Sequence, residues 1–179
     1  GFGVDYERFN FHDFQELKKI TEKIFFKKEY EICFEPGRSL IADSGILVTK
    51  IIRTKRSSKK SFLIVDAGMN NLIRPTLYNA FHRIEPITLI HSRKNKVVDV
   101  VGPICETGDF LALDRKLQEM LKNELLAIMS TGAYGSVMSS NYNSRKNAKE
   151  ILIYKGKDYL IKKELSFNDL IKSEVIPSF

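Results

Sequence analysis

The stretch EPGRSLIADSGILVTKIIRT, residues 35–54, contains the point at which the chain changes from one fold pattern to another. Before it, residues 11–28 carry apolar side chains at helical spacing, which predicts an amphipathic helix. Residues 30–34, YEICF, form a short apolar run that Pro36 and Gly37 interrupt, which predicts a buried strand. A helix followed by a strand is the unit from which α/β layers are built.

Residues after 45 follow a different pattern. Short runs rich in β-branched residues alternate with turn residues, and no long helical period interrupts them. We therefore predict a mostly β chain, in which residues 45–179 form an antiparallel β-sandwich or barrel domain and residues 1–44 are a fragment of an α/β layer. The predicted strands lie within residues 45–54, 61–68, 83–91, 96–104, 124–130, 150–156 and 158–164.

Local turn and cap signals refine this pattern. Gly156 in YKGKDY is free to adopt a positive φ, which predicts a hairpin turn. Pro75 suits the first turn of a short helix in residues 74–81, and Ser166 with Asp169 resembles a capping box at the start of another helix. We expect these two helices to interrupt the β domain.

The composition limits the class of protein. The chain has 179 residues, of which 43% are hydrophobic, and this is enough for a core. No apolar run approaches the roughly 20 residues that cross a bilayer, and the first residues lack the basic and apolar regions of a signal peptide. Cys33 and Cys105 have no CxxC spacing, and His12, His82 and His91 have no ligand spacing. We predict a cytoplasmic protein with reduced thiols, no membrane partner and no metal site.

The net charge of +7 suggests nucleic-acid binding, and TKRSSKK, residues 54–60, is the densest basic run. This run lies between two β-rich segments, where a solvated turn is expected, and no aromatic side chains alternate with it to stack on bases. We therefore predict no nucleic-acid partner. A basic β domain that binds nucleic acid or an acidic protein stays a competing interpretation.

Two glycine-containing segments suit the binding of an anion. Gly37 and Arg38 in EPGR offer backbone amides and a forked cation that match phosphate or carboxylate. The same motif is also common as a strand-end turn with a surface ion pair. Gly1 and Gly3 offer a second and weaker amide cradle, since a pair of glycines is more often only a turn.

Three further segments carry reactive or charged side chains. Arg74 and Tyr78 are four residues apart, so a helix places them on one face, either as a carboxylate clamp or as a surface arginine above a buried tyrosine. Glu106 is suited to receive a substrate ammonium, and Cys105 either donates a proton or packs as a small apolar group. Tyr134 lies among small residues, which let a ligand approach the backbone closely.

Together and in this order, the motifs resemble the C-terminal part of the diaminopimelate decarboxylases, pyridoxal-phosphate (PLP) enzymes of the alanine-racemase and ornithine-decarboxylase type. The resemblance covers nearly the whole chain, and it implies that residues 1–44 are the last α/β segment of a truncated, PLP-binding (β/α)8 barrel. For the resemblance to be false, several separated motifs would all have to match by accident. The matching segments are GFGVDY, EPGRSLIADSGILVT, DAGMNNLIRPTLY, VVGPICETGDFLALDR, GAYGSVMSSNYNSR and YLIKKE.

The resemblance implies a role for five residues toward PLP. Glu35 is similar to the carboxylate that faces the pyridine nitrogen, where it keeps the ring protonated so that the charge left by departing carbon dioxide spreads into the cofactor. Gly1, Gly37 and the amide of Arg38 resemble the phosphate cradle. Tyr134 resembles the tyrosine that reaches the phosphate, and we assign it to the substrate pocket as well.

The resemblance also implies how the substrate is held. The Arg38 side chain, with Arg74 and Tyr78, resembles the group that binds the carboxylate of the centre that does not react. Cys105, which we assign as catalytic together with Glu35, and Glu106 resemble the pair supplied by the neighbouring subunit of a homodimer, with Glu106 meeting the distal ammonium.

These assignments predict that the complete enzyme converts meso-2,6-diaminopimelate to L-lysine and carbon dioxide. A diamino diacid presents both a carboxylate and an ammonium at its far end, which an arginine pair with a glutamate matches. The alternatives are a polyamine-pathway decarboxylase of the ornithine, arginine or carboxynorspermidine type, and a racemase-like relative.

The sequence departs from the family in one important respect. The family's Schiff-base lysine stands in a Y-x-x-K-A-N-like context, and no lysine here does; the barrel histidine and most of the glycine-rich loop are also absent. One helix and one strand cannot form a stable α/β layer, because their apolar faces need neighbours. We therefore expect this chain to be part of a longer protein and inactive by itself.

Overall fold

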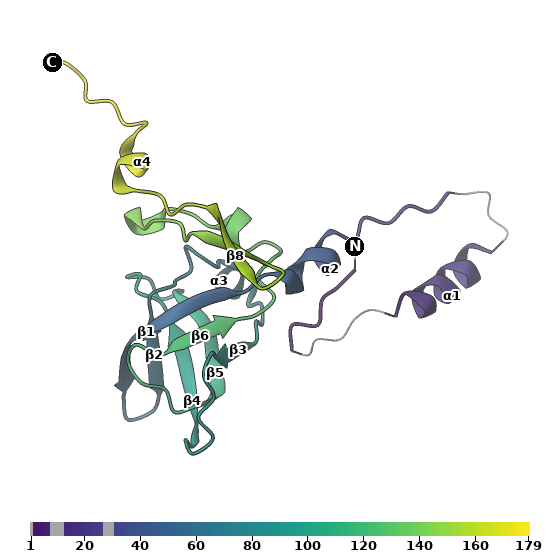
Figure 1. Ribbon diagram of the computed structural model, residues 1–179, viewed down its shortest axis with the longest axis horizontal. Coiled ribbons are helices and arrows are strands. Elements are labelled where there is room, and N and C mark those ends of the chain that lie inside the picture. Colours follow the sequence, from purple (N-terminus) through teal and green to yellow (C-terminus); the bar gives the residue numbers. More distant parts are fainter. Residues whose placement is uncertain (1, 8–12, 27–30) are drawn as a thin grey trace.

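The computed structural model describes residues 2–7, 13–26 and 31–179. Its main body is a six-stranded sheet in the order β3-β6-β1-β2-β4-β5, with a separate two-stranded sheet, β7-β8 (Figure 1). The strands are β1 (Leu47–Arg56), β2 (Ser61–Val65), β3 (Ile84–Pro86), β4 (Asn95–Val101), β5 (Phe110–Gln118), β6 (Leu125–Ile128), β7 (Glu150–Tyr154) and β8 (Lys157–Lys162). The mostly β prediction is confirmed, since every predicted run contains a strand.

β1 joins the two halves of the large sheet. Residues 47–50 pair with β6 and residues 51–56 pair with β2, with a register shift between Ile51 and Arg53. A shift of this kind bends a strand and increases its twist. The sheet therefore curls on itself into a barrel-like body rather than lying flat (Figure 1).

One pairing differs from the antiparallel prediction. β2 and β4 are parallel, whereas the other pairs in both sheets are antiparallel. The chain between β2 and β4 contains helix α3 (Arg74–Tyr78) and β3. A connection of this length returns the chain to the end of the sheet at which β2 began, so that the next strand runs in the same direction.

The curled sheet encloses one apolar core. Its fully buried side chains come from β1, β2, β4, β5 and β6, and from the loop that follows β2. Burying a side chain of this size stabilises the fold by about 1.5–3 kcal/mol. The largest of them are Ile51, Val65, Leu72, Val100, Leu111, Leu126 and Ile128.

Strand β5 is absent from the predicted strands. Its sequence, FLALDRKLQ, has charged residues at its centre, which interrupt the apolar alternation. In the structure, Asp114 adopts a positive φ of 51°, and the register with β4 shifts nearby. The amide of Asp114 donates to Asp99 Oδ1 at 2.7 Å. This irregularity lets the strand continue through a sequence that does not alternate.

The helices are short apart from α1 (Phe14–Phe25), which Asp13 caps by accepting from two backbone amides. The others are α2 (Gly37–Ile41), α3 and α4 (Phe167–Ile171). The predicted helix starts at Pro75 and Ser166 are confirmed, the second with a complete capping box. The predicted strand at residues 30–34 is wrong for residues 31–34, and Tyr30 lies outside the described residues. A strand needs a neighbour for its backbone groups, and no described strand pairs with this segment.

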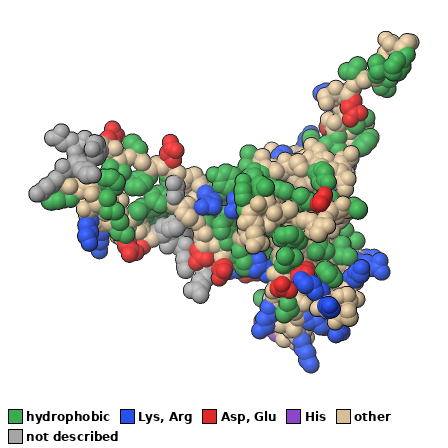
Figure 2. Space-filling view, turned by 180° about the vertical axis from the view of Figure 1, so that it is seen from behind, with side chains coloured by type: hydrophobic (Ala, Val, Ile, Leu, Met, Phe, Trp, Pro, Cys, Tyr) green, Lys and Arg blue, Asp and Glu red, His purple; other side chains and the backbone are tan. Residues whose placement is uncertain are grey.

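Helix α1 and the β7-β8 hairpin are among the segments that expose apolar side chains. α1 lies apart from the sheets and carries hydrophobic side chains on its surface (Figures 1 and 2). Phe14 and Ile24 are among them. In the β7-β8 hairpin, Ile153 and Ile161 are also exposed.

The predicted hairpin turn is confirmed: Tyr154 pairs with Lys157, and the two residues between them have positive φ. Such turns match the twist of the flanking strands. The domain boundary at residue 44 stays a prediction.

None of the helices in the described part of the chain combines the length and the apolar character that spanning a membrane requires.

Candidate functional site

Arg74 is a buried cation at the start of α3. Only 7% of its surface is exposed, whereas Tyr78, one turn later, is 60% exposed. Its guanidinium lies 5.3 Å from the ring centroid of Tyr6, 5.8 Å from that of Tyr134 and 5.9 Å from that of Tyr78. The predicted pairing of Arg74 with Tyr78 is present, but the burial is the reverse of the surface-arginine alternative.

His82 is the hydrogen-bond partner of Arg74. Its side chain is fully buried, and its Nε2 accepts from Arg74 Nε at 3.3 Å. Its Nδ1 lies 2.9 Å from the carbonyl oxygen of Met129, so Nδ1 carries the proton. Burial lowers the pKa of His82, and the charges of Arg74 and Arg115 lower it further. His82 is therefore neutral at pH 7.

No carboxylate of the described residues forms an ion pair with Arg74. A cation that is removed from water without an anion is unfavourable. The faces of the three tyrosines stabilise it in part, because the π-electrons attract a positive charge. The arrangement suits an anionic ligand that completes the coordination of the guanidinium.

The segment that carries Tyr134 is tied to the end of α2. The amide of Gly132 donates to the carbonyl of Ala42 at 2.9 Å, and Ser130 Oγ donates to Asp43 Oδ1 at 2.5 Å. A Cβ at Gly132 would collide with the carbonyl oxygen of Ile41, so only glycine permits this approach. Tyr134 itself has a φ of 59°, an unfavourable value for a tyrosine. These contacts hold α2 and Tyr134 in a fixed relation.

The residues of EPGR lie at the start of α2. Glu35 is exposed and Arg38 is half-buried. Among the described residues, neither side chain forms a hydrogen bond or an ion pair with Arg74 or Tyr78. The shared binding of a substrate carboxylate by Arg38, Arg74 and Tyr78 stays a prediction. Gly1 lies outside the described residues. The roles predicted for Glu35 and Gly1 stay predictions.

Cys105 and Glu106 lie in the loop between β4 and β5, which Asp109 holds in place. This carboxylate is 4% exposed and accepts from the amides of Met69 and Ile104, both at 2.6 Å. It thereby joins the loop before α3 to the loop of Cys105 and Glu106. Thr76 in α3 adds a second link by donating to the carbonyl of Gly108 at 2.5 Å. Cys105 is a free, exposed thiol, as is Cys33.

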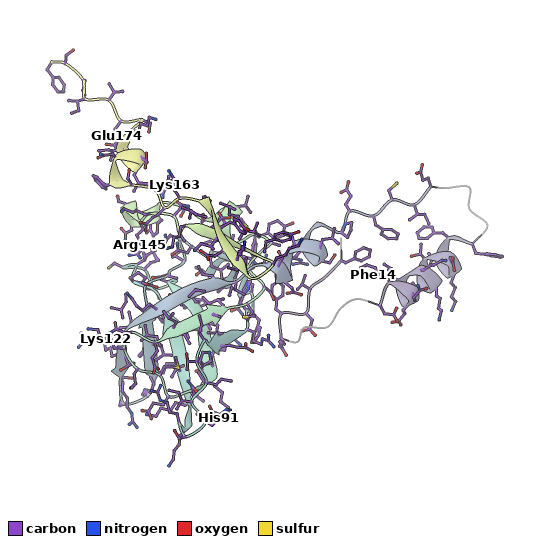
Figure 3. All side chains as sticks on the ribbon, viewed as in Figure 1. Phe14, His91, Lys122, Arg145, Lys163 and Glu174 are labelled. Carbon is purple, nitrogen blue, oxygen red and sulfur yellow. The ribbon has the colours of Figure 1, made fainter. Side chains whose placement is uncertain are left out.

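Tyr142 is the partner of Glu106, and its hydroxyl donates to Glu106 Oε2 at 3.0 Å. The hydrogen bond to Glu106 and its negative charge raise the pKa of Tyr142, with a smaller contribution from Cys105. Arg145, labelled in Figure 3, ties this segment to the body by donating to the carbonyl of Asp66 at 2.7 Å. Tyr142, Cys105 and Glu106 therefore form one group.

Sequence reasoning missed four residues of this site. Tyr6 and Tyr142 are within motifs that we quoted, but nothing in their spacing showed what they contact. His82 was considered only as a metal ligand. Asp109 follows Glu106 in the same acidic loop, and its position between Gly108 and a β run is the signal that was available. Their roles depend on contacts between distant segments.

Comparison with known proteins identifies the family. Residues 12–132 match the family of the C-terminal sheet domain of pyridoxal-dependent decarboxylases. The chain belongs to this family.

Individual relatives of known structure or function agree with this family assignment. The chain is 46% identical over 158 residues to a diaminopimelate decarboxylase of Aquifex aeolicus, covering 88% of this chain and 37% of the relative. It is 48% identical over 143 residues to that of Zymomonas mobilis, covering 80% of this chain and 34% of the relative. The crystal structure of the Helicobacter pylori diaminopimelate decarboxylase complexed with L-lysine superposes with a TM-score of 0.86 at 38% identity, covering 96% of this chain and 42% of that chain.

The chain spans 34% to 44% of the length of the curated relatives. The family name denotes PLP as the cofactor, and the donors at α2 fit its phosphate. The amides of Gly37, Arg38 and Ser39 have no acceptor among the described residues, because the first helical amide that is paired belongs to Leu40. Unpaired amides at the start of a helix bind phosphate well.

Proposed function

We propose that the protein to which this chain belongs is a PLP-dependent decarboxylase that converts meso-2,6-diaminopimelate to L-lysine and carbon dioxide. The observation that carries the proposal is the buried Arg74, which has aromatic and imidazole neighbours but no carboxylate partner in the described chain. A substrate with a second carboxylate supplies the missing anion. The diaminopimelate decarboxylases among the relatives support the same choice.

The far end of this substrate carries one charge of each sign. Arg74, Tyr78 and Arg38 bind its carboxylate, and Glu106 binds its ammonium. A substrate that ends in an amine alone would place a cation beside Arg74, which is repulsive. Charge complementarity therefore selects a diamino diacid over the diamines of the polyamine pathway.

PLP, when bound, supplies a conjugated ring that takes up the electron pair released as the carboxylate departs. Glu35 holds a proton at the pyridine nitrogen, and the amides of residues 37–39 with Tyr134 bind the phosphate. The bond between the α-carbon and its carboxylate breaks, and carbon dioxide leaves. The Cys105 thiol gives its proton to the α-carbon, and the thiolate regains a proton from water.

We further propose that two copies of the protein form a homodimer with shared sites. Cys105 and Glu106 are exposed in the described chain, and a neighbouring subunit would receive them. The Schiff-base lysine is proposed to lie outside the 179 residues. The chain by itself is therefore expected to release no lysine.

The test is to incubate the complete protein encoded by the gene, with PLP and meso-2,6-diaminopimelate, and to measure carbon dioxide and L-lysine. The 179-residue chain is assayed in parallel. Lysine from the complete protein alone supports the proposal. Turnover of ornithine but not of diaminopimelate would contradict the substrate, and exchange of the α-proton without carbon dioxide would contradict the reaction.

A further inference from the structure

We propose that His82 is a positioning residue that orients the guanidinium of Arg74 and leaves its positive charge available to the substrate carboxylate. The inference rests on the proposed function, because it deepens the role of Arg74 in binding the substrate.

The imidazole connects Arg74 to the sheet through both ring nitrogens. Nδ1 donates to the carbonyl of Met129, which directly follows β6, and Nε2 accepts from Arg74 Nε. The amide of Met129 donates to the carbonyl of Arg83 at 2.8 Å, next to His82 in sequence. Because β3 pairs with β6 at this point, the imidazole is fixed at both ends.

Neutrality of the partner matters as much as its position. A carboxylate in the place of His82 would neutralise Arg74 and occupy two of its N–H groups. The imidazole accepts only from Nε. The terminal nitrogens of Arg74 therefore have no hydrogen-bond partner in the described chain, and they keep the fork that matches a carboxylate.

The groups around His82 oppose its protonation. Arg74 and Arg115 contribute positive charge, and Arg115 lies with its guanidinium 3.5 Å from the centroid of the Phe81 ring. The Tyr6 ring packs edge-on against the imidazole with centroids 4.8 Å apart. No carboxylate faces the imidazole from the described elements packed against it. A neutral acceptor is the stable state of this side chain.

The test compares ligands that differ only in a carboxylate. L-lysine and 1,5-diaminopentane are titrated separately into the complete PLP-loaded protein by calorimetry, for the parent, His82→Leu and His82→Gln. Leucine removes the acceptor, whereas a glutamine amide can donate to Met129 and accept from Arg74. We expect His82→Leu to weaken L-lysine binding about 10-fold or more, as for one charge-assisted hydrogen-bonding group, with 1,5-diaminopentane unchanged and with glutamine restoring most of the loss.

Steady-state kinetics provides the second readout. His82→Leu is expected to raise KM for diaminopimelate by a similar factor with little change in kcat, since the chemistry occurs at the other end of the substrate. Should His82→Leu fail to fold, as judged by its thermal transition, His82→Asn removes the reach to Arg74 with less change in polarity. Equal affinity of the variant and the parent for L-lysine would overturn the inference, as would equal loss of both ligands.

Failure of the proposed function would look different. A parent protein that binds L-lysine more tightly than 1,5-diaminopentane but does not turn over diaminopimelate contradicts the decarboxylase and leaves the His82 comparison measurable. A parent that binds both ligands equally contradicts the carboxylate clamp, and the inference with it.

Discussion

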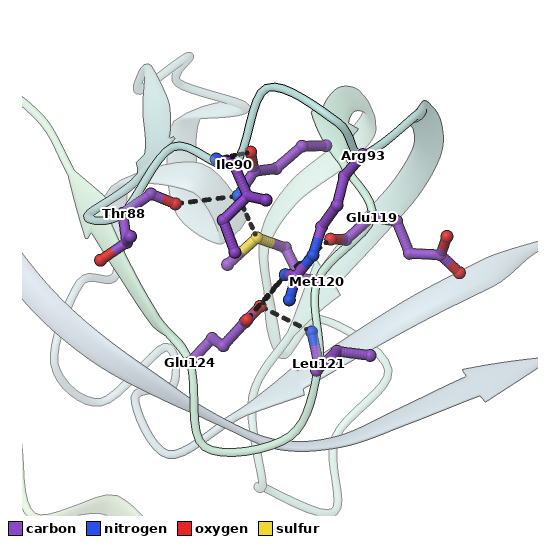
Figure 4. Close-up of polar contacts among 8 residues, drawn as sticks. Thr88, Ile90, Arg93, Glu119, Met120, Leu121 and Glu124 are labelled. Atoms are coloured by element: carbon purple, nitrogen blue, oxygen red, sulfur yellow. Dashed lines mark hydrogen bonds and ion pairs between the residues drawn. The ribbon is translucent and has the colours of Figure 1, made fainter.

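Two arginines at opposite ends of the sheet body differ in whether their charge is paired. The charge of Arg93 is paired with a carboxylate, whereas no carboxylate of the described residues pairs with Arg74. Arg93 lies in the loop before β4, where its Nη1 contacts both oxygens of Glu124 at 2.6 and 2.7 Å and the carbonyl of Glu119 at 3.1 Å (Figure 4). Glu124 also accepts from the amide of Leu121 at 2.8 Å. In the part of the chain that the structure describes, the guanidinium of Arg74 contacts His82 and aromatic faces but no carboxylate.

The two networks share a residue type but differ in what they leave unsatisfied. The neighbouring Gln118 is also satisfied, since it donates to the carbonyl of Thr88 and accepts from the amide of Ile90, both at 2.9 Å (Figure 4). The charges of Arg93 and Glu124 are paired with each other, so this network stabilises the fold. Among the described residues no carboxylate pairs with Arg74, which is why we propose that a ligand supplies the anion.

The largest expected effect separates the two arginines. Arg74→Ala is expected to lower kcat/KM for diaminopimelate by roughly 100-fold, because it removes a charge-assisted carboxylate contact of about 1.5–3 kcal/mol. Its thermal midpoint should fall as well, because the buried His82 loses its hydrogen-bond donor. Arg93→Ala should keep an activity close to that of the parent, with a loss of stability of about 1 kcal/mol.

Steady-state kinetics and thermal unfolding of both variants check this prediction. If Arg74→Ala lost stability and activity in equal measure to Arg93→Ala, the distinction between the two networks would be wrong.

The next effect concerns Asp109, whose carboxylate is hydrogen-bonded through both oxygens and lies between the loop before α3 and the loop of Cys105 and Glu106. Asp109→Ala leaves the partly buried amide of Met69 and the buried amide of Ile104 without an acceptor, and it should cost about 2 kcal/mol of unfolding free energy. Asp109→Asn keeps one acceptor oxygen and is expected to lose about half as much. Denaturant unfolding measures both values. A small and equal change in the two variants would show that Asp109 does not join the two loops.

A smaller effect is expected at the exposed edge of the site. Tyr142→Phe removes the hydrogen bond to Glu106 without changing the ring, and exposed pairs of this kind contribute about 1 kcal/mol or less. KM for diaminopimelate should therefore rise a few-fold, with kcat and stability unchanged. Tyr154→Phe, on the exposed hairpin, is the matched control. An unchanged KM in Tyr142→Phe would contradict a role in orienting Glu106.

The smallest effect is the pH dependence that His82 imposes on stability. The pKa of His82 is lowered in the folded state from 6.5, so the unfolded chain binds the proton more readily. The contribution of His82 is fully present above pH 6.5 and is lost as the pH falls from there toward the folded pKa. Thermal midpoints between pH 8 and pH 5 should decline less in His82→Gln than in the parent. Parallel curves would contradict the buried neutral imidazole.

Much of the fold could be predicted because its signals are local. The hairpin turn at Lys155 and Gly156 and the capping box at Ser166 are decided by neighbouring residues, and both predictions are confirmed. Strand β5 was missed because its pairing with β4 tolerates charged residues and an irregular Asp114. The strand predicted at residues 30–34 failed in its described part because an apolar run becomes a strand only beside a partner.

The candidate site also has features that local sequence predicts and features that depend on contacts between distant segments. The spacing of Arg74 and Tyr78 predicted their common helix face, and the acidic loop singled out Cys105 and Glu106. Nothing local indicated that Arg74 would be buried while Tyr78 stayed exposed, because burial depends on what other segments cover. The roles of Glu35, Arg38 and Gly1 stay predictions.

The sequence by itself determined the strand-rich pattern, the turns and caps, and the family to which the chain belongs, since each of these is read from residues close together or from motifs in order. Tertiary structure alone decided the environment of Arg74. Its neighbours Tyr6, His82 and Tyr134 come from separate segments that only folding brings together. A charge becomes a binding site when water is excluded and no anion is provided, and both conditions are properties of packing rather than of sequence.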